Sequence, residues 1–542
     1  APVMVTSSST VSYDDSLQQL QQSQNQQSFL LQHDIELESS AALFAVDVSL
    51  LVQTNKGTAS ATNVGINLAK TAAGTGILAL PFAAKEGGIF LFVVGTLAIA
   101  VWNVFGLKRL CDCLELLQEQ QHRNALVVLQ KEESFVKEEH DKNQDDNNYT
   151  EQVTEPVSPP SLKSSRNRKK RRKRPLPPPP AGTATLGKVA YYALGDVGIV
   201  VLDIMLLLLL CGIVIAYEVA ILAFVRGTPF TTGNNLVDAT IIAVLLVPLC
   251  MVDDMSNLSK LSHLGLVILA FAMLVIAGYG VAGYDTNQAD SNYVYDNPFH
   301  FLPPNGLTGV SHWFGCVVFG FGIVPLTFNF RESMADPNLL PQTALVSMLL
   351  VAAAYIVTGM ALLFLYPDIQ DDVLSQIPDG GLATVTRLAM VVVVMATAPL
   401  LIVPCAEIIE GKIHHDGQVH PKTRLLARSG LSLFTVAISV TLPGFVTVLA
   451  FVGCFSVSLV SFCVPPFLHW VLLRQQQQFQ QQQQQQPPHS LEQESEHPHS
   501  EEKLLPPYRI LPLAIDAIAI VFGLTTTAVT TLFTFRKLMN KE

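Results

Sequence analysis

The sequence predicts an all-α polytopic membrane protein with about eleven transmembrane helices in a 5+5 inverted repeat, helices 1 and 6 being discontinuous. Three observations predict this fold class. Of the 542 residues, 49% are hydrophobic and only 14% are charged, whereas soluble domains carry about 25% charged residues. The apolar residues form long runs of the length that a bilayer requires. The first and sixth of these runs contain matching Gly-x-Gly-Ile segments, each followed by a proline.

A spanning helix needs about 20 mostly apolar residues, and eleven segments of the chain approach or exceed this length. The ninth is the shortest, and Pro443-Gly444 separates it from the tenth. The predicted spans are 60–84, 88–112, 195–225, 236–253, 261–283, 309–331, 342–366, 383–409, 426–442, 445–472 and 509–534.

Loop charges predict the orientation. Residues 114–184, between spans two and three, carry 13 Lys or Arg, and the loop between spans eight and nine is also basic, whereas loops 284–308 and 367–382 carry none. Because basic loops stay in the cytoplasm, we expect a cytoplasmic N-terminus. The serine- and glutamine-rich start of the chain does not have the pattern of a signal peptide. The sequence does not distinguish a vacuolar or lysosomal membrane from the plasma membrane.

Polar segments divide the chain into six parts. The charged and proline-rich loop contains a basic run, Arg166–Arg174, which could contact anionic lipid at about 1 kcal/mol per cation; a solvated loop that fixes topology is the alternative. Such polar segments cannot bury a core, so we expect disorder in them. The parts are a disordered cytoplasmic segment 1–58, helices 1 and 2 in 59–113, a disordered loop 114–185, helices 3–10 in 186–472, a glutamine-rich cytoplasmic loop 473–507, and helix 11 with a short tail in 508–542.

The two Gly-Pro segments predict broken helices. The first span contains Gly74-Thr75-Gly76-Ile77 before Pro81, and the sixth contains Gly320-Phe321-Gly322-Ile323 before Pro325. Glycine lowers helix propensity, and proline removes a donor and collides with the preceding turn. In lipid, an interrupted helix survives only where it lines a cavity, and paired interruptions in corresponding halves point to a midplane site. Close helix packing by glycine is the alternative for either motif alone.

Several function classes are disfavoured. The basic run lacks the interleaved aromatic residues of nucleic-acid-binding segments, so we expect no nucleic-acid partner. The sequence contains no nucleophile elbow, phosphate-binding loop or paired catalytic carboxylates, so we expect no enzyme and no cofactor. The eight cysteines lack the spacing of a metal site. His414, His415 and His420 are interpreted as surface residues of a basic loop.

The segment from Asn67 through Ala83, followed by Gly87-Gly88, resembles the first-helix signature of the amino acid/auxin permease family, which includes vacuolar and proton- or sodium-coupled neutral amino-acid transporters. The similarity runs from about residue 60 to 534, interrupted by the polar insertions. Supporting segments are Gly212 with Tyr217, Arg331 through Pro337, Pro399 through Glu410, and Gly453 with Pro465, Pro466 and His469.

The resemblance implies a leucine-transporter-like fold that moves amino acids by alternating access. It implies that the first break meets the charged ends of the substrate and that the sixth closes the other wall. The expected substrate-binding residues are Gly74, Thr75, Gly76, Ile77, Gly320, Phe321, Gly322 and Tyr217. The cation-coupling candidates are Asn67, Lys70 and Thr397, the gating candidates are Glu332 and Glu407, and the coupling ion is H⁺ or Na⁺.

Charged residues within spans are costly and are functional candidates by default. Lys70 is either a gate or a lysine that snorkels to the interface. Asp203 and Asp516 are candidate proton carriers, and Glu410, like Glu407, is expected to pair with Lys412 or Arg424.

The sequence therefore predicts a symporter of small neutral amino acids, embedded in the lipid bilayer and driven by a cation gradient. A membrane amino-acid sensor that uses the same midplane site without net flux is the alternative.

Overall fold

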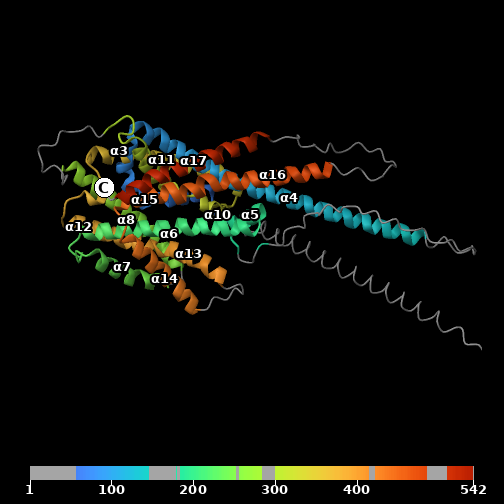
Figure 1. Cartoon of the computed structure of the whole chain (residues 1–542), viewed down its shortest axis with the longest axis horizontal. Coiled ribbons are helices and arrows are strands. Elements are labelled where there is room, and N and C mark those ends of the chain that lie inside the picture. The colour runs from blue at the N-terminus through green and yellow to red at the C-terminus, as the bar shows by residue number, and fades with distance from the viewer. Residues whose placement is uncertain are drawn as a thin grey trace, which may run out of the picture. The chain divides into compact units, whose positions relative to one another are not determined.

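The computed structural model describes residues 57–145, 179, 183–251, 255–283, 299–413, 421–484 and 510–540 (Figure 1). Regular structure in these ranges is helical, apart from an isolated parallel bridge between Ala59 and Met334. The elements are α2 (Ala61–Ala72), η1 (Thr75–Ala79), α3 (Leu80–Phe90), η2 (Leu91–Gly95), α4 (Thr96–Asp145), α5 (Thr185–Leu194), α6 (Asp196–Arg226), α7 (Asn235–Cys250), α8 (Met255–Val281), α9 (Gly306–Gly320), η4 (Val324–Leu326), α10 (Thr327–Ser333), η5 (Pro337–Leu339), α11 (Leu340–Leu365), η6 (Val373–Ser375), α12 (Gly381–Thr397), α13 (Pro399–Ile413), α14 (Pro421–Ser439), α15 (Phe445–Val452), η7 (Gly453–Val457), η8 (Leu459–Cys463), α16 (Val464–Gln484) and α17 (Ile510–Asn540).

The polytopic all-α class is confirmed. Within the described ranges, seven helices are long and apolar enough to cross a membrane, and two further apolar helices, Asn235–Cys250 and Gly265–Val281, are shorter. Every predicted span coincides with helical structure, but the count of eleven crossings stays a prediction. The ninth span, α14, is less apolar because it turns Arg428, Ser432 and Thr435 into the protein, where all three are buried.

The boundaries of the predicted disordered loops are wrong in two places. Helix α4 continues to Asp145, through the first part of the predicted loop 114–185, because leucine, glutamine, glutamate and lysine are good helix formers. An ion pair between Arg123 and Glu119 at 3.1 Å supports this extension. Helix α16 likewise continues to Gln484. The basic run Arg166–Arg174 lies outside the described residues.

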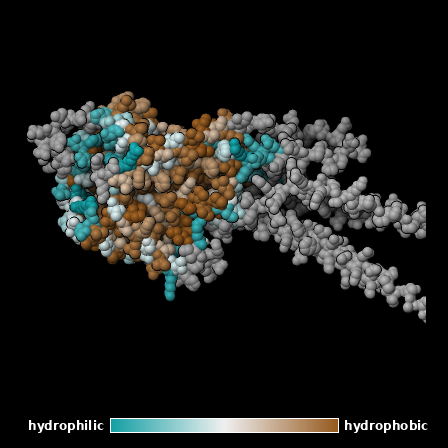
Figure 2. Space-filling view, in the orientation of Figure 1, coloured by the Kyte–Doolittle hydropathy of each residue, from teal (hydrophilic) through white to brown (hydrophobic). Residues whose placement is uncertain are grey.

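Chain contacts divide the protein into two compact units, and residues 56–117 and 182–542 form the larger one. Its helices surround one core of buried apolar side chains. Many large apolar side chains lie on its surface, and Figure 2 shows them as a brown band across the middle of the helices, with hydrophilic residues at both ends. A surface of this kind matches a hydrocarbon layer bordered by water.

The two ends of this bundle differ in the elements that meet there. At the α9 end, where α9 begins, the backbone N–H groups of Ile89 and Phe90 donate to the carbonyl oxygens of His300 and Phe301 at 2.8 and 3.1 Å. At the α10 end, where α10 ends, the N–H of Ala59 donates to the carbonyl of Ser333 at 3.1 Å. The end of α3 is thus joined to the segment before α9 at one end, and the segment before α2 is joined to α10 at the other.

Candidate functional site

The first span is interrupted at the predicted place. Helix α2 ends at Ala72, and Gly74 adopts an extended conformation before the 3₁₀ helix η1. Pro81 does not break a turn, contrary to the predicted collision with the preceding turn, because it lies in the first turn of the new helix α3. That position tolerates proline, since its missing N–H would have no partner there. The break is therefore made by Ala73 and Gly74.

The sixth span is interrupted in the same way. Helix α9 ends at Gly320, the residues Phe321 to Ile323 are not helical, and the chain continues through η4 into α10. Pro325 again lies at the start of a helical segment, η4. The matching Gly-x-Gly-Ile segments thus mark two matching breaks.

One side chain joins the two breaks. The hydroxyl of Tyr355, on α11, lies 2.6 Å from the carbonyl oxygen of Ala72 and 3.3 Å from that of Gly320. These carbonyls belong to the last residues of α2 and α9, so two negative helix ends meet at one point. Any side chain at Gly320 would strike the Tyr355 ring, since an added Cβ would lie 2.7 Å from it. Glycine is required there for the tyrosine to reach both carbonyls.

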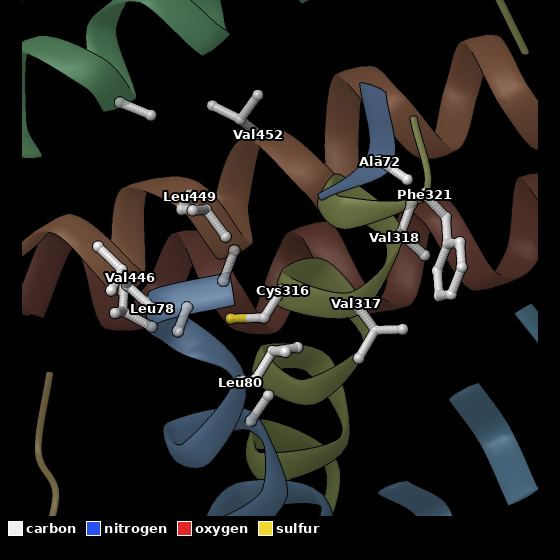
Figure 3. Close-up of a cluster of buried hydrophobic side chains, with 14 of the residues drawn as sticks. Ala72, Leu78, Leu80, Cys316, Val317, Val318, Phe321, Val446, Leu449 and Val452 are labelled. Carbon is white, nitrogen blue, oxygen red and sulfur yellow. The ribbon is translucent and has the colours of Figure 1, made fainter. Parts of the chain in front are cut away.

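Apolar side chains pack around the two breaks. Figure 3 shows Ala72 beside Phe321, with Leu78, Val446 and Leu449 gathered nearby. All five belong to one buried cluster. The ring of Phe321 packs on that of Tyr355, with 5.3 Å between their centroids. A ligand held between the breaks would therefore meet backbone dipoles at its polar end and hydrocarbon around the rest.

The structure brings some of the predicted substrate-binding residues together. Gly76 is buried, and a Cβ there would lie 3.3 Å from the ring of Phe319 and 3.9 Å from Cα of Gly320, so the two breaks are adjacent. Gly322 lies close to Val457 of η7. Tyr217, on α6, is half-buried against the core. Gly74, Thr75, Ile77 and Phe321 lie within the non-helical or 3₁₀ segments of the breaks.

The cation-coupling candidates occupy different helices. Asn67 is exposed and Lys70 half-buried on α2, which packs against α11. Thr397 is the last residue of α12, which packs against α6 and α8. Its hydroxyl donates to the carbonyl of Val393 at 2.7 Å. The eighth span is therefore two helices, α12 and α13, that meet at Ala398 before Pro399.

Several predicted ion-pair assignments are corrected. Lys412 pairs with Asp203 at 2.9 Å rather than with the glutamates of α13, and Asp203 is thereby part of an ion pair. Glu410 is buried 3.9 Å from the guanidinium of Arg428. Glu407 is exposed. Glu332 accepts a hydrogen bond from Thr185 at 2.7 Å, which joins α5 to α10.

Asp516 is also part of a buried charge cluster. One of its oxygens lies 2.9 Å from Nε of Arg109 and the other lies 2.5 Å from Nδ1 of His469. This cluster joins α4, α16 and α17. Both carboxylate oxygens of Asp516 are thus engaged by side chains of other helices, and its role as a proton carrier stays a prediction.

At the α9 end, the connection Tyr366–Gly380 between α11 and α12 folds over the bundle and its 3₁₀ turn η6 packs against η1. Arg387, on α12, anchors it by donating to the carbonyls of Ile377 at 2.7 Å and of Gly227. Burial, with the neighbouring carboxylate of Asp371, raises the pKa of Asp372 to about 7. A cavity of about 230 Å³ lies beside this connection, between α6, η6 and α12.

Three site residues were missed by the sequence analysis. Tyr355 lies in an ordinary apolar run, where tyrosine gives no signal. Glu86 and His312 lie within or beside predicted spans one and six and deserved the same attention as Lys70; the structure buries both. Among the described residues, no three His, Cys, Asp or Glu side chains are arranged to hold a metal ion.

Comparison with known proteins agrees with this architecture. The family model of the transmembrane amino acid transporter protein matches residues 57–126 and 180–488, which include both breaks. The chain belongs to the transmembrane amino acid transporter family. It is also 23% identical over 309 residues to the amino acid transporter ANT1 of Arabidopsis thaliana, an alignment that covers 53% of this chain and 69% of the relative.

The family confirms the resemblance seen in the sequence. It also identifies the chain as an integral multi-pass membrane protein and a transporter, not an enzyme. Amino acids are the substrates for which the family is named.

Proposed function

We propose that this protein is a secondary active transporter that binds a small neutral amino acid between the two helix breaks and moves it by alternating access. The observation that carries the proposal is the meeting of the carbonyl ends of α2 and α9 at Tyr355. A helix end carries about half a negative charge, so two such ends make a site for an ammonium group. The starts of η1 and η4 would offer N–H groups to the carboxylate.

The apolar lining supports a neutral substrate. A charged side chain placed among Leu78, Phe321 and Leu449, all fully buried, would lose its hydration without gaining a partner. The close approach of Gly76 to Phe319 leaves little room beside the first break. Both features favour a small side chain on the substrate.

The packing of corresponding helices supports an inverted repeat. If α2–α8 and α9–α16 form the two repeats, the broken first members pack against each other through α3 and α9. The third members, α6 and α12, also pack together, and so do the fourth members, α7 and α14. A two-fold axis in the membrane plane brings equivalent helices into such pairs.

The breaks supply the hinges that alternating access needs. On one side of them, α3 packs against α9 and is bonded to the segment before it; on the other, the residues before α2 are bonded to the end of α10. Each pair of half-helices can therefore move as a unit about Ala73-Gly74 and Phe321–Ile323. The basic loops favour a cytoplasmic position for the α10 end, so we expect the α9 end to face the lumen or the outside.

A proton or sodium gradient would supply the energy, with Asn67, Lys70 and Thr397 as the coupling candidates. One charge crossing 100 mV is worth about 2.3 kcal/mol, which corresponds to roughly fiftyfold accumulation. Purified protein in liposomes, assayed with imposed pH and sodium gradients, would identify the ion. If neither the pH gradient nor the sodium gradient produced concentrative uptake, secondary active transport would be contradicted.

Counterflow of labelled amino acids tests the binding site directly. Gly320→Ala should abolish counterflow, because its methyl group would strike the Tyr355 ring and separate the breaks. Gly278→Ala is the matched control, since a Cβ at Gly278 on α8 meets nothing within 4 Å. Saturable binding without counterflow in the unsubstituted protein would instead indicate a sensor. Equal counterflow in both variants would refute the proposed site.

A further inference from the structure

Two buried titratable side chains face each other across the two discontinuous helices. Glu86 lies on α3, six residues after Leu80, and His312 lies on α9, eight residues before Gly320. Both therefore belong to the half-helices that lead from the breaks to the α9 end. Oε2 of Glu86 lies 3.8 Å from Nδ1 of His312.

The helices touch closely around this pair. An added Cβ at Gly309 on α9 would lie 2.5 Å from the backbone oxygen of Glu86, and one at Gly87 on α3 would lie 2.7 Å from the ring of Trp313. Trp313 follows His312 directly and is buried. The contact between α3 and α9 is therefore tight where the pair lies, and any separation of the two helices would expose both side chains.

His312 is incompletely satisfied in this closed arrangement. Its side chain is fully buried, and neither ring nitrogen has a hydrogen-bond partner among the described residues. Glu86, by contrast, accepts two hydrogen bonds from Asn305 at 3.1 Å. A neutral imidazole left in this state lacks the hydrogen bonds that water would restore if the helices parted. A protonated imidazole gains the Glu86 carboxylate and turns the 3.8 Å contact into an ion pair.

The charges around the pair are compatible with a protonated His312. From α17, the ammonium of Lys537 lies 5.3 Å from the centre of the Phe82 ring and attracts both the Glu86 carboxylate and that of Asp371. On α3 itself, Lys85 is turned to the carbonyl of Ile369. With His312 protonated, two cations face two carboxylates.

The other elements packed against α3 or α9 contribute little charge here. The segments η1, η2 and α15 contain no titratable side chain. From η7, Cys454 donates to the carbonyl of Ser311 at 3.2 Å. From α11, Tyr355 is engaged at the breaks, and Arg536 of α17 lies over the ring of Phe533.

We propose that Glu86 and His312 form a proton-binding latch, in which a proton taken up by His312 holds α3 against α9 and closes the α9 end. The role of this latch in transport rests on the alternating access proposed above. Since the ion pair exists only while the helices are together, each 1.4 kcal/mol that it contributes shifts the closed-to-open ratio tenfold. Acidification at the α9 end therefore favours closure.

Trp313 supplies a direct measurement of closure, because it lies between the two helices. The full chain contains three tryptophans, so the double variant Trp102→Phe with Trp470→Phe leaves Trp313 as the reporter. Its quenching by aqueous acrylamide, measured in the purified full-length protein, should rise severalfold from pH 5 to pH 8, the range in which histidine changes charge.

Variants in this background test the pair itself. His312→Gln and Glu86→Gln should each abolish the pH dependence, whereas Glu86→Asp, which keeps the carboxylate, should retain it. His300→Gln is the matched control, since His300 is exposed at the same end and only its backbone carbonyl is bonded to α3. Size-exclusion chromatography checks that each variant is folded.

The possible results separate this inference from the proposed function. Quenching that is independent of pH in the parent protein, or that keeps its pH dependence in folded His312→Gln, would overturn the latch. Amino-acid counterflow is measured separately at constant pH. Absence of counterflow in the parent protein would contradict the proposed transport and would not affect the quenching result. Counterflow without pH-dependent quenching would contradict the latch alone.

Discussion

Replacing Tyr355 by phenylalanine removes the hydroxyl that contacts both helix breaks. The ring remains and keeps its packing on Phe321, whereas the carbonyl of Gly320 loses its donor and the carbonyl of Ala72 keeps the N–H of Gly74 at 2.7 Å. A buried acceptor left without a partner costs about 1–3 kcal/mol. We therefore expect Tyr355→Phe to lower the stability of the substrate-free protein by about that amount.

Bound substrate should restore much of the stability that Tyr355→Phe loses. If its ammonium group binds the same carbonyls, it supplies the missing donor in Tyr355→Phe, while in the parent protein it must compete with the hydroxyl. The variant should then bind substrate more tightly, by roughly 5- to 150-fold for 1–3 kcal/mol. Thermal unfolding in detergent, with and without saturating amino acid, measures both effects, because ligand binding to the folded state raises the midpoint.

Tyr366→Phe is the matched control for this experiment. Tyr366 is also buried, and its hydroxyl donates to the carbonyl of Ile276 at 2.6 Å, away from the breaks. Its loss should lower stability without changing the shift that the substrate produces. An equal substrate-induced shift in the parent protein and in both variants would refute the placing of the ammonium at the helix ends.

Three further predictions concern the packing and the charge of the bundle. Gly453→Ala should lower the thermal midpoint by the equivalent of about 1–3 kcal/mol, because its Cβ would collide with the backbone of α9, whereas Gly411→Ala, in open space, should not lower it. Arg387→Met should destabilise the protein by about 1–3 kcal/mol for each buried carbonyl that loses its donor, and Asp379→Asn, whose carboxylate is exposed, by less than about 1 kcal/mol. The pKa of Asp372 is raised to about 7, so the folded protein keeps a proton that the unfolded chain releases from about pH 4 upward. The thermal unfolding midpoint should therefore decrease as the pH rises from 4 to 7. Asp372→Asn should flatten this part of the profile.

The two breaks were predictable because their cause is local. Gly74 and Gly320 weaken the helix at their own positions, and a proline a few residues later can start a new helix but cannot continue the old one. The exact place of the first break was less certain from sequence. Pro81 pointed to the turn just before it, whereas the chain leaves the helix at Ala73 and Gly74, and the proline lies in the first turn of α3.

The helix extensions beyond the membrane were not predicted because a charged composition was interpreted only as a disordered loop. The segment after span two is rich in charge, which predicted a loop, but its residues are individually good helix formers. Helix α4 therefore runs on from an apolar stretch to Asp145 without a capping signal in between. Hydropathy marks where a helix can leave the bilayer and does not mark where it ends.

The partners across the breaks could not be predicted from the same kind of evidence, because they are joined only in three dimensions. Tyr355 is 283 residues from Ala72, and nothing in its own segment distinguishes it from a tyrosine in an apolar helix. Glu86 and His312 gave a stronger signal, since an ionisable residue beside a discontinuous span must be paired or accessible to water. Their meeting shows that the fold does more than place two breaks together. It also brings the half-helices beyond the breaks into contact, so that a change of charge on one half-helix changes the electrostatic interaction with the other.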